Sequence, residues 1–192
     1  MKTQFFAIMT LMILSTSCKV GFNFKNGFGY TTIKGGGTFS SVLNLTGTNM
    51  PISGEMFKTN TDIKIAESIV LYDLRIKGFK PAQVPTNKEA SQDLVNNEDT
   101  YKSCSGAPDM SWLASADIFI VNNRTGARQM IATWSKSIND QDNLDCVLTF
   151  DAQDGVNIKD FMPDFSVELE ASGRQPQTDT LLGGIIGVDV GL

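Results

Sequence analysis

The sequence contains no histidine. Histidine is the usual general base near neutral pH, so its absence excludes Ser-His-Asp and Cys-His catalysis in their ordinary forms. Histidine-ligated zinc and iron sites are excluded for the same reason. The sequence also lacks a phosphate-binding P-loop and a dinucleotide-binding glycine fingerprint after a strand. These absences predict a protein that is not an enzyme and that needs no cofactor.

Positive charge is scarce and scattered. The chain has 16 Lys and Arg residues against 21 Asp and Glu residues, which gives a formal net charge of −5 at pH 7. Contacts with nucleic-acid phosphates need concentrated Lys and Arg, so no nucleic-acid partner is expected. Attraction to anionic lipid headgroups is disfavoured for the same reason. Any attachment to a membrane should therefore depend on acyl chains.

Long apolar runs are missing, apart from one at the N-terminus. The segment from Phe5 to Leu14 is apolar except for Thr10, and it follows a short start that carries the single charge of Lys2. This run is too short for a lasting transmembrane anchor, and its layout is typical of a secretory signal peptide. We therefore predict that residues 1–17 form a signal peptide.

A cysteine follows directly after three small residues, Ser15-Thr16-Ser17. This pattern resembles the lipobox of bacterial lipoproteins, in which the cysteine becomes the acylated first residue of the mature chain. The sequence departs from that pattern at Ser15, where an aliphatic residue is usual, and Leu14 stands one place early. The resemblance implies lipidation of Cys18. The alternatives are plain secretion or a free Cys18.

The residues after Cys18 bear on which side of the outer membrane the protein would face. Some Gram-negative groups mark export to the cell surface with acidic residues at this place, and residues 19–23 contain none. By that analogy, we expect an outer-membrane protein on the periplasmic face.

The two remaining cysteines are Cys104 and Cys146. An oxidising compartment permits a disulfide, so we predict a bond between them. Two reduced, buried thiols are the alternative. A metal site is disfavoured, because two cysteines without histidine make a poor zinc set.

Apolar residues alternate with polar ones along most of the chain. Such period-two alternation indicates strands with one buried and one solvated face, which is typical of antiparallel sheets. The alternating segments lie at residues 20–25, 70–77, 118–121, 128–135, 144–150 and 165–171, and we expect a last strand at residues 180–190. This number and spacing of strands predicts an all-β, antiparallel β-sandwich.

Turn residues separate these segments. We predict one hairpin at residues 122–126, a second at residues 173–176, and a short helical turn at residues 155–162 that Pro163 ends. The stretch from Lys80 to Asp109 carries three prolines and many polar residues, so we predict a long polar loop there.

The organisation that we predict is a lipid-anchored N-terminal arm, partly strand, over residues 18–61, followed by a β-sandwich domain over residues 62–192. Gly35-Gly36-Gly37 divides the arm. It lacks the Lys-Ser/Thr and the helix that a phosphate-binding loop needs, so we interpret it as a flexible joint.

The second half also resembles a known type of protein. The segments that carry the resemblance are residues 68–76, 112–121, 155–161 and 165–171. Over residues 62–190 the chain is similar to uncharacterised Gram-negative envelope lipoproteins with an immunoglobulin-like β-sandwich. The resemblance implies a fold and a location, and the family supplies no activity.

Two sets of residues are weak candidates for binding. Asp140, Asp142 and Asp145 could offer oxygen ligands to calcium, although the spacing lacks the glycine and the closing glutamate of an EF-hand, and a polar turn is the simpler interpretation. Trp112 could stack on a sugar. Trp134 is in phase with apolar neighbours and is expected in the core.

Glu168 and Glu170 point from the same face of one predicted strand. A glycosidase needs two carboxylates on either side of one sugar bond, but this spacing is also what solvated sheet residues show. We interpret both as surface residues.

The sequence thus predicts a non-enzymatic, lipid-anchored cell-envelope protein with a structural or protein-interaction role. Its membrane contact would be the acyl chains on Cys18, and its partner an envelope protein or the cell wall. The alternative is a glycan- or small-ligand-binding lipoprotein.

Overall fold

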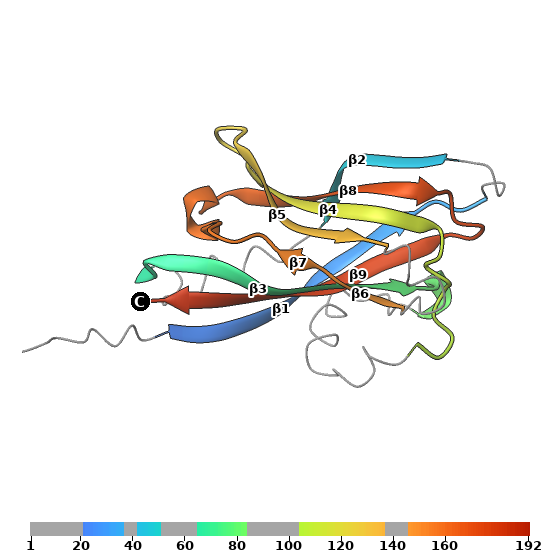
Figure 1. Ribbon diagram of the computed structural model, residues 1–192, viewed down its shortest axis with the longest axis horizontal. Helices are drawn as coiled ribbons and strands as arrows, with labels where there is room; N and C mark the ends of the chain where they lie inside the picture. The colour runs from blue at the N-terminus through green and yellow to red at the C-terminus, as the bar shows by residue number, and fades with distance from the viewer. Residues whose placement is uncertain (1–20, 37–41, 51–64, 84–103, 137–145) are drawn as a thin grey trace, which may run out of the picture.

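The computed structural model describes residues 21–36, 42–50, 65–83, 104–136 and 146–192. Within these residues the chain forms two antiparallel β-sheets that pack against each other, so the predicted all-β sandwich is confirmed (Figure 1). The strands are β1 (Gly21–Ile33), β2 (Val42–Met50), β3 (Ser68–Phe79), β4 (Leu113–Asn122), β5 (Arg128–Ser135), β6 (Val147–Thr149), β7 (Asp151–Ala152), β8 (Phe165–Arg174) and β9 (Thr180–Gly191). Two short 3-10 helices, η1 (Pro81–Gln83) and η2 (Ile158–Phe161), complete the described elements.

One sheet has the strand order β1-β9-β3-β6, and the other has the order β2-β8-β4-β5-β7. β1 and β2 therefore each form the edge of a sheet. Both come from the segment that we treated as an N-terminal arm, and Phe22 and Phe24 of β1 pack against the main core. By strand pairing, the sandwich includes residues 21–33 and 42–50 as well as the strands of the predicted 62–192 unit.

The core lies between the two sheets and follows the predicted alternation on β8, whereas on β3 a register shift between Leu71 and Asp73 leaves Val70 and Tyr72 exposed and Leu71 buried. On β8, for example, Val167, Leu169 and Ala171 are buried while Glu168 and Glu170 are not. Large buried side chains from both sheets fill the interior; they include Ile69, Leu74 and Ile76 of β3, Ile118 and Ile120 of β4, and Ile186 and Val188 of β9. Removal of this apolar surface from water is the main stabilising contribution, at about 25 cal/mol per Å².

A β-bulge interrupts the alternation on β5. Ile118 faces Ala132 across the pair and Phe119 faces Met130, so Ile131 is an extra residue. Ile131 and Ala132 are consequently both buried. Trp134 is half-buried and packs against the core, as predicted.

The second predicted hairpin, at residues 173–176, is wrong. β8 and β9 are consecutive in the chain but belong to different sheets, so residues 174–180 cross from one layer of the sandwich to the other. In an immunoglobulin domain the last two strands share a sheet, whereas here the last strand lies between β1 and β3. Turn residues alone mark a change of direction and do not specify which neighbour the next strand pairs with.

The first hairpin and the helical turn are confirmed. β4 and β5 pair on either side of residues 122–127, where Gly126 has a φ of 72°. The turn contains η2, and the side chain of Asn157 accepts hydrogen bonds from the backbone N–H groups of Lys159 (3.1 Å) and Ile69 (2.9 Å). Asn157 thereby caps the helix and fastens it to β3.

Several predictions fall outside the described residues. These are the signal peptide, the lipidation of Cys18, most of the Lys80–Asp109 loop, and the calcium candidates Asp140, Asp142 and Asp145. Among the residues that the structure does describe, no helix has the length and apolar character that crossing a bilayer requires.

Candidate functional site

A pocket of about 380 Å³ lies at the end of the sandwich where the chain crosses from β8 to β9. Two stretches form its walls, Ala107 to Trp112 before β4 and Arg174 to Thr180 between the sheets, and Lys80 joins them from the end of β3. We call this end of the sandwich the distal end. In Figure 1 it is the end at which β8 finishes and β9 begins.

The wall before β4 is held in place by packing and by a turn. Met110 is buried against Gly78 of β3, where an added Cβ would lie 2.6 Å from the Met110 sulfur. The carboxylate of Asp109 accepts hydrogen bonds from the backbone N–H (2.8 Å) and the hydroxyl (2.7 Å) of Ser111. Glycine at position 78 therefore lets this wall sit directly on the sheet.

A disulfide holds the stretch of chain that leads into the wall before β4. Cys104 and Cys146 are bonded, with an S–S distance of 2.06 Å, as predicted. The backbone carbonyl of Cys146 accepts a hydrogen bond from the N–H of Gly78 (3.2 Å). The disulfide thus links the stretch that leads into the pocket wall to a residue already bound to β3.

The wall between β8 and β9 is bound to the residues that follow β1. The carboxylate of Asp179 accepts hydrogen bonds from the backbone N–H of Gly35 (2.8 Å) and from Nζ of Lys34 (3.0 Å). The Gly35 N–H, followed by Lys34, lowers the pKa of Asp179 below its ordinary value. The N–H of Gly36 donates to the carbonyl of Gln177 at 3.0 Å. Gly35 and Gly36 therefore form part of a fixed contact, and our interpretation of them as a flexible joint is wrong.

Trp112 lies on the pocket wall with 7 % of its surface exposed. Its carbonyl accepts a hydrogen bond from the N–H of Arg174 (2.6 Å), which joins the two walls. Its indole Nε1 is buried and has no hydrogen-bond partner within the described part of the chain. A buried indole N–H normally finds an acceptor, and the described residues leave this one unsatisfied. Trp112 belongs to the main hydrophobic core, so its ring is core packing and not an open platform for a sugar.

The charged groups at the pocket are Lys80, Arg174 and Asp109. All three are exposed residues, whereas Trp112 and Thr180 are buried. The two cations also take part in other interactions. The charge at the pocket is therefore mixed, and the other polar residues of its lining are neutral.

Glu168 and Glu170 of β8 lie on the outer face of the sheet β2-β8-β4-β5-β7. Both carboxylates pair with the same arginine. Arg128 donates to Glu168 through Nε (3.1 Å) and to Glu170 through a terminal nitrogen (2.6 Å). The guanidinium of Arg128 also lies 3.5 Å from the centroid of the Phe119 ring. The arrangement is a cross-strand ion-pair cluster stacked on an aromatic ring.

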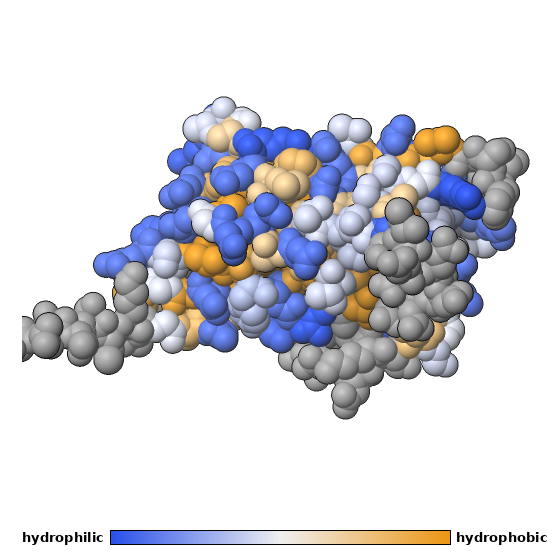
Figure 2. All heavy atoms as spheres, in the orientation of Figure 1, coloured by the Kyte–Doolittle hydropathy of each residue, from blue (hydrophilic) through white to orange (hydrophobic). Residues whose placement is uncertain are grey.

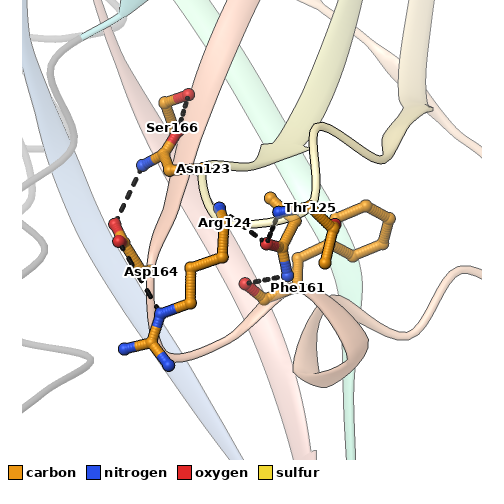
Figure 3. A network of polar contacts seen from close by, with 7 residues as sticks. Asn123, Arg124, Thr125, Phe161, Asp164 and Ser166 are labelled. Carbon is orange, nitrogen blue, oxygen red and sulfur yellow. Dashed lines mark hydrogen bonds and ion pairs between the residues drawn. The ribbon is translucent and has the colours of Figure 1, made fainter.

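A second polar network occupies the opposite end of the sandwich, where β4 ends (Figure 3). Asn123 donates to Asp164 (2.9 Å) and accepts from the hydroxyl of Ser166 (3.0 Å), and Arg124 pairs with Asp164 at 4.0 Å. These contacts join the β4–β5 hairpin to the start of β8. The network therefore connects the hairpin to β8 through exposed side chains.

Among the described residues, the face seen in Figure 1 is mainly polar. Figure 2 shows hydrophilic residues over most of this face, with apolar residues in separate small groups. The described part of the chain also contains no cluster of three or more His, Cys, Asp or Glu residues that could hold a metal ion. The pocket is the candidate site that the described geometry supports best.

No family model, curated protein or solved structure matches the chain. Function must therefore be argued from the geometry of the site. Sequence reasoning selected Trp112, but it missed Asp179, Gly35 and Arg174, which build the pocket. Of these three residues, only Gly35 had a recognisable pattern in the sequence, the run of three glycines. A glycine can mark a close approach of two backbones as well as a flexible joint.

Proposed function

We propose that the protein is a non-enzymatic, lipid-anchored protein of the cell envelope that works by binding. In this proposal Cys18 carries the acyl chains, and the folded sandwich faces the periplasm from the outer membrane. The Cys104–Cys146 disulfide supports a location outside the cytosol, because such bonds persist in oxidising compartments. The engagement of Glu168 and Glu170 by Arg128 supports a structural use of the carboxylates that most resembled a catalytic pair.

The observation that carries the proposal is the position of the pocket relative to the start of β1. Only Lys19 and Val20 separate Cys18 from β1. β1 pairs with β9 so that Gly21 faces Gly191 and Ile33 faces Thr180, a pocket residue. Across the 13 residues of β1, the two ends lie about 40 Å apart. A tether at Cys18 would hold the Gly21 end at the membrane and present the distal end to an envelope protein or to the cell wall.

The anchor can be tested by labelling cells with an alkyne analogue of palmitate. We expect the full chain to be labelled and to fractionate with membranes, and Cys18→Ser to lose both properties. Ser17→Ala is the matched control, because it keeps a small residue before the cysteine. Recovery of the unlabelled chain, with residues 1–17 still attached, from the cytosolic fraction would contradict the proposal.

The orientation can be tested with a photo-crosslinking residue in the lipidated protein. At position 177, on the pocket wall, it should capture a discrete envelope protein or wall fragment. At position 124, in the hairpin at the other end, it should capture lipid or nothing. Equal capture of the same partner from both positions would contradict a role for the distal end.

Binding of a small ligand is a second candidate function, and one observation favours it. Hydroxyl and amide side chains line the pocket of about 380 Å³, in walls that several hydrogen bonds hold in place.

A further inference from the structure

We infer that the first part of β1, residues 21–28, is a releasable strap. While the strap is paired with β9, it mounts the sandwich directly beside the lipid anchor. When it separates, the sandwich is attached only through a flexible segment that joins the fold near residues 28–31. The role of this release rests on the proposed anchor at Cys18, but the opening is a property of the fold and can be measured without the anchor.

β1 is an edge strand, so the strap has one neighbouring strand. Its residues pair with β9 in an unbroken register, from Gly21 opposite Gly191 to Phe28 opposite Gly184. The order β1-β9-β3-β6 gives the strap no second partner strand among the described residues. β9 is also paired with β3, so it keeps a partner strand on its other side when the strap separates.

The strap ends at a β-bulge. The register with β9 shifts between Phe28 and Thr31, where three steps along β1 correspond to two along β9. Beyond the bulge, Ile33 is buried in the core, and the carboxylate of Asp179 accepts a hydrogen bond from the N–H of Gly35 (2.8 Å). Because the ladder is interrupted at the bulge, the pairing on its two sides can break separately. The opening should therefore stop at residues 28–31.

A buried polar side chain weakens the strap. Asn26 has 1 % of its surface exposed, and neither its amide nitrogen nor its oxygen has a hydrogen-bond partner within the described part of the chain. It shares the inner face of β1 with Phe22 and Phe24, which pack against the core. A buried amide without partners raises the free energy of the closed state, and contact with water on release removes that cost. Asn26 therefore favours opening.

The other contacts of the strap are also modest. Phe22 and Phe24 are only half-buried. Nζ of Lys25 lies 3.4 Å from Asp73, but Asp73 also accepts a hydrogen bond from Nε of Arg75 at 2.9 Å and so keeps a partner after release. The two glycines of the strap add conformational entropy to the released chain. Opening should therefore cost less free energy than unfolding of the sandwich.

Release changes how the anchor holds the sandwich. In the closed state only Lys19 and Val20 lie between Cys18 and the fold. In the open state residues 19–28 form one flexible segment. A β-strand is already extended, so this segment adds little height above the membrane. It adds rotation, because the sandwich can then tilt and turn about the bulge, and the distal end can reach partners to the side.

Hydrogen exchange measures the opening. The protein is purified from cells in mild detergent, so the measurement reports on the fold whether or not Cys18 carries acyl chains. In the wild type, the protected amides of the strap should exchange at least about tenfold faster than those of β8, with little dependence on urea concentration. The protected amides of residues 31–33 should exchange as slowly as those of β8.

Two variants of β1 test the cause. Asn26→Leu should slow the exchange of the strap about tenfold, because an apolar side chain replaces the buried amide without partners. Asn23→Leu makes the same change on the exposed face of the same strand, and it should leave the exchange rate within about twofold of the wild-type rate.

Two engineered disulfides test the release directly. Asp189 of β9 pairs with Asn23 of β1 on one side and with Val70 of β3 on the other. Asn23→Cys combined with Asp189→Cys locks the strap to β9, and its protected amides should then exchange as slowly as those of β8. Val70→Cys combined with Asp189→Cys locks β9 to β3 instead, and the fast exchange should remain. Mass spectrometry of non-reduced peptides selects the protein in which each bond has formed.

Three results would overturn the inference. They are equal exchange rates for the strap and β8 in the wild type, exchange of residues 31–33 as fast as that of the strap, or a strap that opens as readily in Asn26→Leu as in the wild type. The palmitate-labelling experiment reports on the anchor separately. A strap that opens in a protein without label would contradict the anchor alone, and a labelled protein whose strap stays closed would contradict the release alone.

Discussion

Gly35 packs directly against the backbone of Thr178. A Cβ added to Gly35 would lie 2.1 Å from the carbonyl carbon of Thr178, which is far closer than two carbon atoms can approach. This contact joins the end of β1 to the stretch that crosses between the sheets. The absence of a side chain at position 35 is therefore a requirement of the pocket wall.

Substitution of Gly35 tests this contact. Gly35→Ala should lower the free energy of unfolding by about 2–3 kcal/mol, because the backbone of Thr178 has to move away from the new methyl group. Gly155→Ala is the control. Gly155 has a φ of 76° and nothing within 4 Å of its added Cβ, so alanine there carries only the conformational cost of about 1 kcal/mol. Chemical denaturation of both variants gives the comparison, and equal losses would contradict a steric role for Gly35.

Asp73 predicts how stability depends on pH. The side chain is largely buried on β3 and accepts a hydrogen bond from Nε of Arg75 (2.9 Å), with Nζ of Lys25 at 3.4 Å. Burial alone would raise the pKa of Asp73, but the hydrogen bond and charge of Arg75, with a further contribution from Lys25, outweigh it and lower that pKa. A lowered carboxylate pKa contributes stability above the unfolded-state value of about 3.9, and this contribution is lost as pH falls through the lower folded-state value.

The expected result is a pH-dependent difference between variants. At pH 7, Asp73→Asn should be less stable than the wild type by about 1 kcal/mol. The two proteins should converge in stability as the pH falls from about 3.9 through the lower folded-state pKa, because the wild-type carboxylate becomes neutral over that range. Urea denaturation at several pH values measures this. Asp154→Asn, at an exposed position, is the charge-matched control, and a difference for Asp73→Asn that stays constant with pH would refute the argument.

Metal removal should leave the protein unchanged. Asp140, Asp142 and Asp145 lie outside the described residues, and their spacing lacks the glycine and the glutamate of a calcium loop. We expect the same melting temperature with excess EDTA as with excess calcium. A rise in melting temperature that follows calcium concentration would show that this stretch binds the ion.

Local patterns in the sequence predicted the strands well. Alternation located β3 and β8, because each buries one face on a single core over most of its length. The turn at residues 122–126 was recognisable because a glycine with positive φ has a strong local signature. Sheet membership was not predictable in this way. The partner of β9 depends on contacts with β1 and β3, which lie far away in the sequence.

The candidate site was predictable only in part. Trp112 stood out by its chemistry, but its neighbours come from the ends of three strands, and only the fold brings them together. Asp179 and Gly35 are 144 positions apart, and no pattern along the chain links them. The Cys104–Cys146 disulfide, by contrast, was predictable, because in an oxidising compartment each of these two cysteines has the other as its natural partner.

The disulfide should contribute substantially to stability. It closes a loop between residues 42 positions apart, which corresponds to roughly 4 kcal/mol in the chain-entropy description. Reduction with dithiothreitol should therefore lower the melting temperature by roughly 10 °C for a domain of this size. The double variant Cys104→Ser/Cys146→Ser should melt at the lower temperature with or without reductant. If dithiothreitol leaves the melting temperature of the wild type unchanged, and its peptides carry free thiols, the disulfide is refuted.

Two neighbouring asparagines at the end of β4 should differ in their contribution to stability. Oδ1 of Asn122 accepts hydrogen bonds from the backbone N–H groups of Arg124 and Thr125, both at 3.0 Å, and its amide donates to the carbonyl of Phe161 at 3.4 Å (Figure 3). This one side chain thus closes the β4–β5 hairpin and joins it to η2. Asn123 is exposed, and its side chain bonds to the surface side chains of Asp164 and Ser166.

Asn122→Ala should therefore lower the free energy of unfolding by about 2 kcal/mol, because two backbone donors lose their acceptor within the turn. Asn123→Ala should lower it by less than about 1 kcal/mol, since water can replace its exposed partners. Amide hydrogen exchange gives a second measurement, and protection of the Arg124 and Thr125 amides should fall in Asn122→Ala alone. If both variants lose equal stability, the hairpin is held by its strand pairing, and the side chain of Asn122 is not what closes it.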